Sequence, residues 1–471
     1  MPRLFGTDGV RGLANKELTA RLSLRLGESA ARVLSNVEEE TGKKGGNRKR
    51  ALVGRDTRVS GEFISSAVDA GLASAGVDVI DIGILPTPGI AYLTSILGVE
   101  LGVVISASHN PMPDNGIKFF SSSGFKLDDA VEDEIEARLE EPWARPTGAG
   151  VGRIIYDNEA VIKTYVDHLV SSIMPEGVDQ KDYINLKPLS GLKIVMDCAN
   201  GASSVVAPEA LRMAGADVTV INASPDGYNI NDNCGSTHPE QLQAMVVATH
   251  ADMGVAFDGD ADRCIAVDEK GELVDGDKII AILAKQMHRE GKLKDNKVVL
   301  TVMSNLGTRK SLEAEGISLE TTGVGDRYVL ERMLEQDLTL GGEQSGHIIN
   351  RNHSTTGDGT LSALFLANAL IKERERLNSK IELSELSGQI MRLPQVLINV
   401  GNVDKHSVDD CESVQAVVKE VEAELGDSGR VLLRPSGTEP LIRVMVEAAT
   451  NDQAKRSAEK IAEKVKEELS L

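Results

Sequence analysis

Aromatic residues are scarce in this chain of 471 residues, at 3% of the total. That scarcity argues against stacking platforms for single-stranded nucleic acid. Basic residues are also in deficit, with 51 Lys and Arg against 72 Asp and Glu, which gives a formal charge of −21. Such an acidic surface repels polyanions, so neither nucleic acid nor an anionic membrane is expected as a partner. The one dense basic segment, residues 42–50, predicts a solvated loop, with a binding patch as the alternative.

Cysteine and long apolar runs are lacking as well. The four cysteines are scattered and form no CxxC pair, which favours free thiols in a reducing compartment over disulfides or a zinc site. No apolar run approaches the roughly 20 residues that span a bilayer, and the N-terminus shows no apolar signal-peptide core. We therefore expect a soluble, cytoplasmic protein.

What the chain does contain is glycine, 45 residues, and short aliphatic runs that alternate with amphipathic stretches, the pattern of βαβ units. One unit recurs: residues 52–56 lead into a helical stretch ending at 73–79, and residues 194–197 into one ending at 212–218. Both copies close on an Ala-Gly-x-Asp-Val segment, and a third, shorter copy starts at 298–302. Repeated α/β domains are the simplest interpretation.

The last hundred residues differ from these repeats. Residues 412–425 and 452–469 have the pattern of amphipathic helices, and two apolar runs lie between them within 431–447. This combination predicts a smaller α+β domain. Pro/Gly-rich and polar stretches then suggest the boundaries of four domains: 1–152, 153–256 and 257–378, each α/β, and 379–471, α+β.

Three aspartates stand at alternate positions in a short loop, Asp258-Gly-Asp260-Ala-Asp262, followed by Arg263. Their mutual repulsion is costly unless a cation lies among them, and few hard oxygen ligands with small spacers suit Mg²⁺. An EF-hand is the first alternative, because Glu269 fits its twelfth position. However, Arg263 occupies the position that needs glycine, and the flanks look like strands. A plain acidic surface turn is the second alternative.

A buried strand stops abruptly at Ser106-Ala-Ser108-His109-Asn110-Pro111, with Lys118 shortly after. Ligands of open α/β sheets bind at such carboxyl ends of strands. Taken alone, a Ser-His turn is more often a capping structure. The absence of a G-x-S-x-G elbow leaves a hydrolase triad unsupported.

Two further loops suit recognition of an anion and a sugar. Arg434-Pro-Ser436-Gly437-Thr438, with Arg443 after it, offers backbone N–H groups, hydroxyls and guanidinium groups for a phosphate. An Arg-Pro turn with a hydroxyl cap is its structural alternative. The segment 341–347 places Glu343, Ser345 and His347 at alternate positions among glycines, as binding of sugar hydroxyls requires; by itself it is unspecific.

These four loops, in their order along the chain, resemble the motifs of the α-D-phosphohexomutase family. The resemblance covers essentially the whole chain. The opening segment 5–12 and Gln344 resemble the branch of that family that acts on glucosamine phosphates. The resemblance implies four domains around a central cleft, three of them similar α/β domains with mixed sheets. It also implies a phosphosugar mutase of the isomerase class, with phosphomannomutase or phosphoglucomutase activity as the alternative.

The resemblance further implies roles for individual residues. Ser108 would be the phosphoserine, and Asp258, Asp260 and Asp262 would bind Mg²⁺, with an oxygen of the Ser108 phosphate as the fourth ligand. The remaining catalytic residues would be His109, Lys118 and Arg263. The substrate-binding residues would be Arg11, Arg327, Glu343, Ser345, His347, Arg434, Ser436, Gly437, Thr438 and Arg443. A phosphosugar is the expected ligand, and a homodimer is compatible with the sequence.

The implied reaction passes a phosphoryl group from Ser108 to glucosamine 6-phosphate and takes the other phosphate back from a 1,6-bisphosphate. Its product would feed amino-sugar nucleotide synthesis. His109, Lys118 and His347 are the candidates for the general base, and the sequence does not choose among them. An aspartyl-phosphate enzyme using Asp258 or Asp260 and a non-catalytic sugar-phosphate sensor are the rival interpretations.

Overall fold

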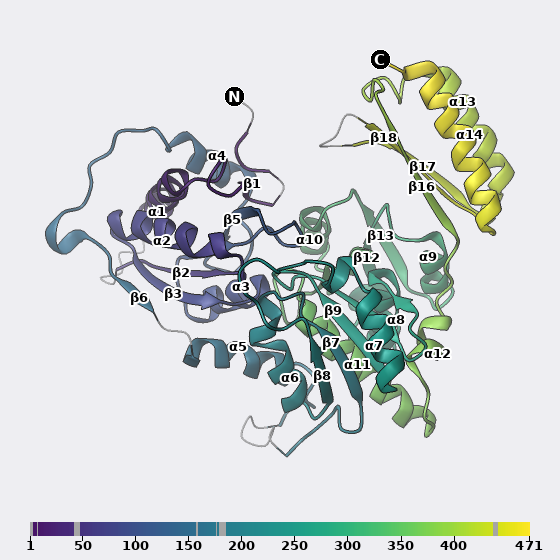
Figure 1. The fold of residues 1–471 in the computed structure, drawn as a ribbon, viewed down its shortest axis with the longest axis horizontal. Helices are drawn as coiled ribbons and strands as arrows, with labels where there is room; N and C mark the ends of the chain where they lie inside the picture. The colour runs from purple at the N-terminus through teal and green to yellow at the C-terminus, as the bar shows by residue number, and fades with distance from the viewer. Residues whose placement is uncertain are drawn as a thin grey trace. The chain divides into compact units, whose positions relative to one another are not determined.

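The structure is a computed structural model that describes residues 3–6, 8–41, 48–156, 159–175, 177–178, 185–436 and 441–471. Internal contacts divide the chain into two units, Met1–Val302 with Glu320–Ser387, and Met303–Leu319 with Gly388–Leu471. We call these the large unit and the small unit and describe each by itself. Figure 1 shows the sheets of the large unit with helices packed against them.

The first sheet is mixed and has the strand order β1-β5-β4-β2-β3-β6. Its strands are β1 (Val10–Leu13), β2 (Arg50–Arg55), β3 (Asp78–Ile84), β4 (Leu101–Ile105), β5 (Asp114–Ser121) and β6 (Ile154–Tyr156). Its helices are α1 (Ala20–Thr41), α2 (Val59–Ser74), α3 (Thr87–Ile96) and α4 (Asp129–Ala137). In α1, Leu22, Leu26, Ala30 and Val33 recur every three or four residues and face the apolar core that α2 and the sheet share.

The second sheet has the order β11-β10-β9-β7-β8. Its elements are α5 (Glu159–Ser171), β7 (Lys193–Asp197), α6 (Ala207–Met213), β8 (Asp217–Ile221), α7 (Glu240–Thr249), β9 (Met253–Phe257), β10 (Cys264–Asp268) and β11 (Leu273–Val274). The boundary expected between 256 and 257 falls inside β9, and β10 pairs with β9. The acidic loop therefore belongs to the second sheet and not, as expected, to the third domain.

The third sheet has the order β13-β12-β14-β15. The elements of this part of the chain are α8 (Gly276–Arg289), β12 (Lys297–Thr301), α9 (Leu306–Glu313), β13 (Ser318–Thr322), α10 (Asp326–Glu335), β14 (Leu340–Gly342), β15 (Ile348–Asn350), α11 (Gly359–Leu377) and α12 (Leu383–Gly388). Short 3-10 helices occupy Gly148–Gly150, Ala202–Val205, Gly235–Thr237, Lys294–Asn296 and Gly426–Ser428.

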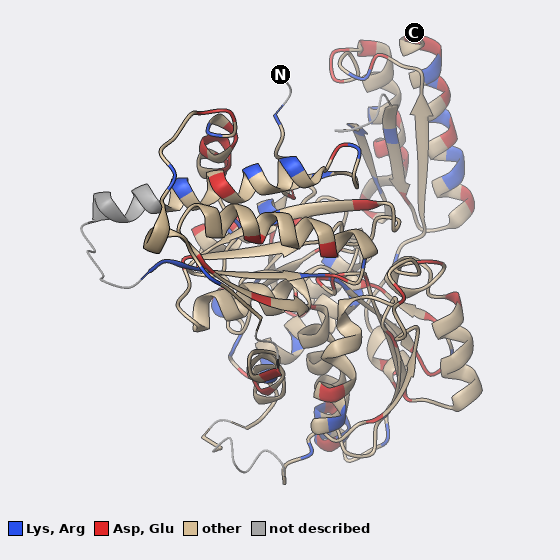
Figure 2. Ribbon diagram, turned by 60° about the vertical axis from the view of Figure 1, so that its left-hand side comes forward, with Lys and Arg blue, Asp and Glu red and all other residues tan. Residues whose placement is uncertain are grey.

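The small unit carries a sheet of three antiparallel strands in the order β16-β18-β17. Its elements are β16 (Gln395–Gly401), α13 (Glu412–Leu425), β17 (Arg430–Pro435), β18 (Leu441–Glu447) and α14 (Asn451–Leu469). Alternate strand residues such as Ile398, Val444 and Leu433 pack with α13 and α14 in one apolar core. Acidic and basic residues intermingle along these helices (Figure 2). The prediction of α/β domains followed by a small C-terminal α+β domain is confirmed.

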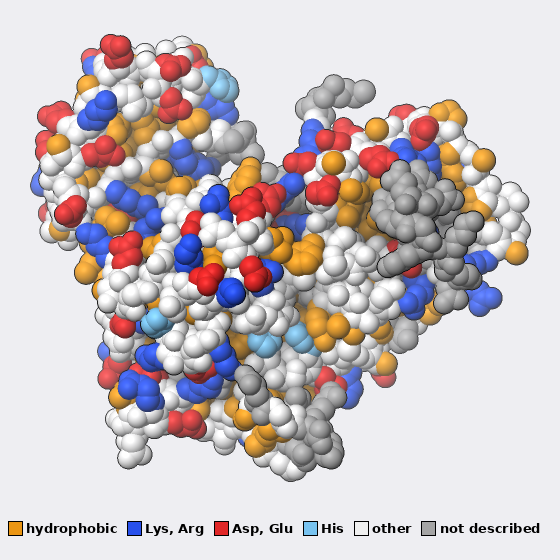
Figure 3. Space-filling view, turned by 180° about the vertical axis from the view of Figure 1, so that it is seen from behind, with side chains coloured by type: hydrophobic (Ala, Val, Ile, Leu, Met, Phe, Trp, Pro, Cys, Tyr) orange, Lys and Arg blue, Asp and Glu red, His pale blue; other side chains and the backbone are white. Residues whose placement is uncertain are grey.

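Among the described residues, no helix is long and apolar enough to cross a membrane. On the face seen in Figure 3, hydrophobic side chains form small groups between charged ones. Of the expected basic loop at 42–50, residues 42–47 lie outside the described residues.

Asp69 of α2 is a buried carboxyl next to Asp81 of β3, and none of the described residues donates a hydrogen bond to either of its oxygens. Burial and the charge of Asp81 raise the pKa of Asp69 to about 8. An unfolded chain loses this proton near pH 4. Between about pH 4 and pH 8 the native state therefore binds more protons, and the free energy of unfolding falls as the pH rises.

We expect Asp69→Asn to remove this pH dependence, because asparagine mimics the protonated carboxyl. At pH 9 the variant should exceed the parent in free energy of unfolding by about 2 kcal/mol or more, whereas at pH 4 the two should agree within about 1 kcal/mol. Urea unfolding at both pH values measures the difference. Asp217→Asn, at an exposed position of β8, is the matched control. An equal effect of Asp69→Asn at both pH values would contradict the assignment.

Candidate active site

Ser108 lies in the turn that follows the buried strand β4. Its φ of 52° is in the left-handed region, and its side chain is buried. The Ser108 N–H donates to Ser106 Oγ at 2.9 Å, and Ser106 Oγ donates to Asp56 Oδ2 at 2.7 Å. Ser106 is thus occupied in holding the turn. The Ser108 hydroxyl instead donates to Asp258 Oδ2 at 2.5 Å and lies 3.5 Å from His109 Nδ1.

A buried arginine that was not predicted from the sequence binds the backbone of this turn. The Arg58 guanidinium donates to the carbonyl oxygens of Ser108, Asn110, Pro111 and Asp114, and its Nε donates to Asp56. From the second sheet's domain, Asn231 Nδ2 donates to the Ser108 and Asn110 carbonyls at 2.9 and 3.2 Å. Because backbone in the left-handed region is unfavourable for serine, these bonds stabilise a strained conformation.

The acidic loop joins β9 to β10 and brings three buried carboxylates together. Asp258, Asp260 and Asp262 each offer an oxygen, and these oxygens all lie within 4.8 Å of one another. Strands on both sides exclude the EF-hand. Glu269, its would-be twelfth ligand, instead accepts hydrogen bonds from Ser384.

The charges of this cluster fit a divalent cation. Burial and the charges of Asp262 and Asp260 raise the pKa of Asp258 well above its usual value. Among the described residues, Asp260 Oδ1 and Asp262 Oδ1 are buried and accept no hydrogen bond. Buried carboxylate oxygens without donors are costly, and a hard cation with oxygen ligands would compensate them.

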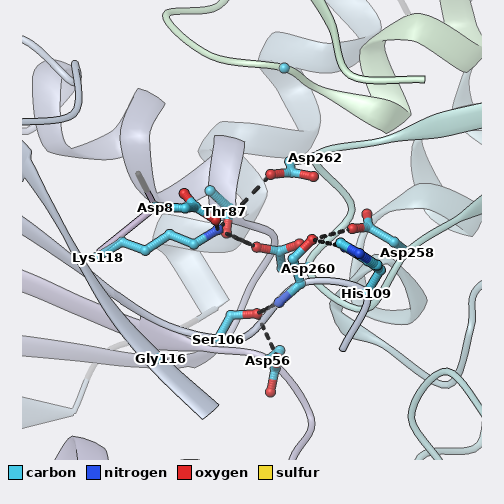
Figure 4. A network of polar contacts seen from close by, with 12 residues as sticks. Asp8, Asp56, Thr87, Ser106, His109, Gly116, Lys118, Asp258, Asp260 and Asp262 are labelled. Carbon is cyan, nitrogen blue, oxygen red and sulfur yellow. Dashed lines mark hydrogen bonds and ion pairs between the residues drawn. The ribbon is translucent and has the colours of Figure 1, made fainter. Parts of the chain in front are cut away.

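Lys118 and Thr87 approach the same carboxylates from the first sheet's domain. Lys118 Nζ lies 3.1 Å from Asp260 Oδ2, and Thr87 Oγ1 donates to that oxygen at 2.7 Å. Burial lowers the pKa of Lys118, but Asp260 and neighbouring carboxylates more than offset this and raise it. Figure 4 shows Lys118 and His109 on opposite sides of Asp260. The charge of Lys118 therefore depends on the carboxylates around it.

The two candidate histidines differ in their surroundings. Burial and the charges of Arg263 and Arg11 lower the pKa of His109 to about 4, so its ring is neutral at pH 7. His347 lies with Nδ1 3.6 Å from Asp262 Oδ2, and its Nε2 accepts from the Gly357 N–H at 3.0 Å. That hydrogen bond places the His347 proton on Nδ1, toward Asp262.

The predicted sugar loop lies against the acidic loop. The Cys264 N–H donates to the Gly346 carbonyl at 2.9 Å. The backbones of Arg263 and His347 form an isolated antiparallel β-bridge. Gly346 has φ 92°, and a Cβ there would lie 2.3 Å from the Cys264 carbonyl oxygen, so only glycine fits. Glu343 accepts from the Gly325 N–H at 3.0 Å, and Ser345 is exposed.

Other side chains of the protein bind two of the arginines predicted to contact substrate. The same is true of Gln344, on which the resemblance to the glucosamine branch partly rests. Arg11 forms an ion pair with Asp8. Arg327 donates to Asp129 at 2.6 Å and to Glu331 at 2.9 Å. Gln344 Nε2 lies 3.4 Å from Asp275 Oδ2, the N-cap of α8.

The small unit holds the predicted phosphate residues. Arg434 of β17 stands directly opposite Arg443 of β18. Burial and the charge of Arg443 lower the pKa of Arg434. Like charges in directly opposed positions repel, so this pair favours an anion. Ser436 is buried next to them, whereas Gly437 and Thr438 lie outside the described residues.

Comparison with known proteins identifies the family. Residues 2–144, 163–271 and 275–387 match the phosphoglucomutase/phosphomannomutase alpha/beta/alpha domains I, II and III, and residues 397–464 match the C-terminal domain of that family. A phosphoglucosamine mutase of Bifidobacterium adolescentis is 61% identical over 471 residues, all of both chains. Another from Corynebacterium jeikeium is 54% identical and covers 99% of this chain and 100% of its own. The chain belongs to the phosphoglucosamine mutases.

Solved structures share the fold of this chain. A phosphoglucomutase/phosphomannomutase family protein of Burkholderia thailandensis superposes with a TM-score of 0.76 at 22% identity, covering 100% of this chain and 99% of its own. The N-acetylphosphoglucosamine mutase of Aspergillus fumigatus, solved with GlcNAc-6P and magnesium, gives 0.69 at 18% identity, covering 98% and 95%. As a phosphohexomutase, the chain is an enzyme of the isomerase class.

For a phosphoglucosamine mutase, the large unit gathers most of the predicted residues in one place. Ser108, the three aspartates and Lys118 meet within hydrogen-bonding or ion-pairing distance. The sequence predicted no role for the residues that hold them there, which are Asp8, Asp56, Arg58, Thr87, Ser106 and Asn231. The signal for two of them was present, since Asp56 and Arg58 directly follow a buried strand, as the predicted nucleophile does.

Proposed function

We propose that this chain interconverts glucosamine 6-phosphate and glucosamine 1-phosphate through a phosphoryl group carried on Ser108. The observation that carries the proposal is the 2.5 Å hydrogen bond between the Ser108 hydroxyl and Asp258, inside a buried carboxylate cluster. A serine hydroxyl requires only one hydrogen-bond acceptor, so three carboxylates are more than the hydroxyl alone requires. A phosphate ester there would need a divalent cation, and three carboxylates would hold one.

Asp258, Asp260 and Asp262 would hold Mg²⁺, which supplies charge neutralisation for the phosphate on Ser108. Lys118 and Arg263 would face the same phosphate, with Lys118 already fixed 3.1 Å from Asp260. Phosphoryl transfer depends chiefly on positioning and on neutralising charge, so this set of cations is sufficient.

In the forward direction, the bond between Ser108 Oγ and phosphorus breaks, and a bond forms from the substrate's free hydroxyl oxygen to phosphorus. The hydroxyl proton passes to a base, for which His109, Lys118 and His347 are the candidates. The resulting 1,6-bisphosphate turns over, and its other phosphoryl group returns to Ser108. The released product is glucosamine 1-phosphate.

Recognition of the sugar and of the second phosphate falls to other loops. Glu343, Ser345 and His347 would bind sugar hydroxyls. Arg434 and Arg443, opposed on neighbouring strands, would clamp the phosphate that is not reacting, together with Ser436, Gly437 and Thr438. Arg11 and Arg327 are proposed as further substrate contacts that exchange their carboxylate partners for the ligand.

The proposal is tested by turnover of the 6-phosphates of glucosamine, glucose and mannose, measured side by side with Mg²⁺ present. We expect kcat/KM for glucosamine 6-phosphate to exceed the other two by at least about 10-fold, because a site that hydrogen-bonds the amino group is left with unpaired polar groups by the other sugars. A preference for glucose or mannose would contradict the glucosamine assignment. No turnover of any of them would support the sensor interpretation.

A further inference from the structure

Asp8 is the centre of a set of charges next to the proposed catalytic residues. Its Oδ2 lies 3.0 Å from Lys118 Nζ and forms an ion pair with Arg11. Its Oδ1 accepts a hydrogen bond from Lys126 Nζ at 2.6 Å. One carboxylate therefore joins three cations, two of which are proposed to act on the substrate. Figure 4 shows Asp8 beside the ammonium group of Lys118.

Lys126 links this carboxylate to another part of the large unit. Its Nζ lies 2.5 Å from Asp326 Oδ2, at the first residue of α10. A chain of ion pairs thus runs from Asp326 through Lys126 and Asp8 to Lys118, which lies 3.1 Å from Asp260. The sign of the charge alternates at every step, so each buried charge has an opposite neighbour.

The neighbours keep these groups charged. Burial alone would raise the pKa of Asp8, but Lys118, Lys126 and Arg11 hold it well below its usual range. Burial alone would lower the pKa of Lys126, but Asp326 and Asp8 raise it above its usual value. Removal of one member therefore leaves its neighbours without compensation and changes where they lie.

We propose that Lys126 is a positioning residue for phosphoryl transfer, acting through Asp8 to hold the Lys118 ammonium group at the carboxylate cluster. The inference rests on the proposed function, because it assigns Lys118 to the transferred phosphate. Lys126 itself contacts neither the three aspartates nor Ser108 in the hydrogen bonds and ion pairs of the described residues. With its ammonium group absent, Asp8 has a free oxygen and draws Lys118 away from Asp260.

The first test is Lys126→Met, which keeps an unbranched chain and removes the charge. We expect kcat for glucosamine 6-phosphate to fall by roughly 10- to 100-fold, because small displacements of a catalytic group have effects of this order. KM should change by less than about 3-fold, since the phosphate clamp is not involved. Lys163→Met, on an exposed lysine of α5 that pairs with Asp167, is the matched control and should leave both constants unchanged.

The conservative variant Lys126→Arg should recover most of the lost rate, to within about 5-fold of the parent. A guanidinium group keeps the positive charge and has five N–H donors with which to reach both Asp8 and Asp326. Space for it exists, because a cavity of about 170 Å³, lined in part by Lys126, Phe125 and Leu330, lies next to the bridge. A rate as low as that of Lys126→Met would contradict a role that depends on the charge at this position.

A double variant separates positioning from simple stability. Lys126→Met combined with Asp326→Asn removes one charge of each sign, so the thermal midpoint should return toward that of the parent. Asp8 still lacks its partner, so kcat should stay as low as in Lys126→Met alone. Recovery of both the midpoint and kcat would mean that Lys126 acts only on stability and would overturn the inference.

Turnover by the parent enzyme separates the proposed function from the positioning role of Lys126. Absence of turnover by the parent protein would overturn the proposed function itself. An active parent together with an unchanged kcat in Lys126→Met would overturn only the positioning role. Combining Asp8→Asn with Lys126→Met should cost no more than Asp8→Asn alone, because Lys126 acts through Asp8; additive losses would contradict that route.

Discussion

Replacing Ser108 with alanine is expected to abolish turnover of glucosamine 6-phosphate, with a loss of about 10⁴-fold or more. The variant lacks the oxygen that would carry the phosphoryl group, so the bisphosphate cannot form from the monophosphate. Its fold should be kept, because the neighbouring hydrogen bonds to the turn come from the backbone of residue 108 and from Arg58 and Asn231. A coupled assay for glucosamine 1-phosphate measures the loss.

Ser106→Ala is the matched control for this experiment. It removes a hydroxyl from the same turn, but one that already bonds Asp56 and the Ser108 N–H. We expect a loss of no more than about 100-fold, through looser positioning of the turn. Near-full activity of Ser108→Ala, or a complete loss in Ser106→Ala alone, would contradict Ser108 as the carrier.

Asp260→Asn is expected to have the second largest effect. The variant removes a negative charge from the proposed metal cage, while Thr87 and Lys118 stay next to position 260. The Mg²⁺ concentration for half-maximal activity should rise by at least about 10-fold, and kcat at saturating Mg²⁺ should fall by about 10²-fold or more. Titration of activity with Mg²⁺ after treatment with a chelator measures both.

The thermal midpoint of unfolding tests the same prediction without an activity assay. Mg²⁺ binds the native state, so it should raise the thermal midpoint of the parent protein and raise that of Asp260→Asn much less. Asp232→Asn, an exposed position of the same domain, should respond as the parent does. Equal Mg²⁺ dependence in Asp260→Asn and the parent would remove Asp260 from the metal site.

The local features of the fold were predictable because they depend on residues that are close in sequence. The amphipathic pattern predicted a helix at 412–425, and α13 spans Glu412–Leu425. The repeated strand-turn-helix units at 52–79 and 194–218 are β2-α2-β3 and β7-α6-β8. Asp56 and Asp197 occupy the same place in these repeats, each accepting a backbone N–H two residues on. Periodicity and turn residues were sufficient for such elements.

The sheet to which each strand belongs was not predictable in the same way. β9 and β10 form a hairpin in the second sheet, whereas the boundary was expected inside β9 because the polar loop after it looks like a linker. β6, only three residues long, completes the first sheet from beyond the expected boundary at 152. Apolar runs reveal that strands exist but not which sheet they join.

The supporting residues of the site were missed for a related reason. Arg58 and Asn231 hold the Ser108 turn, and Asp8 holds Lys118, through bonds to residues that are 50 or more positions away in sequence. A buried arginine or aspartate has no local pattern that distinguishes it from an exposed one. The predicted loops were found because their chemistry is concentrated within a few residues, whereas their supports are dispersed over two domains.

The most direct test of the central claim is to locate the covalent phosphoryl group. The protein is incubated with labelled glucosamine 1,6-bisphosphate and digested, and the label is mapped by mass spectrometry before and after treatment with hydroxylamine. The account predicts label on the peptide that contains Ser108, stable to acid and to hydroxylamine. Label on Asp258 or Asp260 that hydroxylamine releases would contradict it and would establish an aspartyl phosphate in its place.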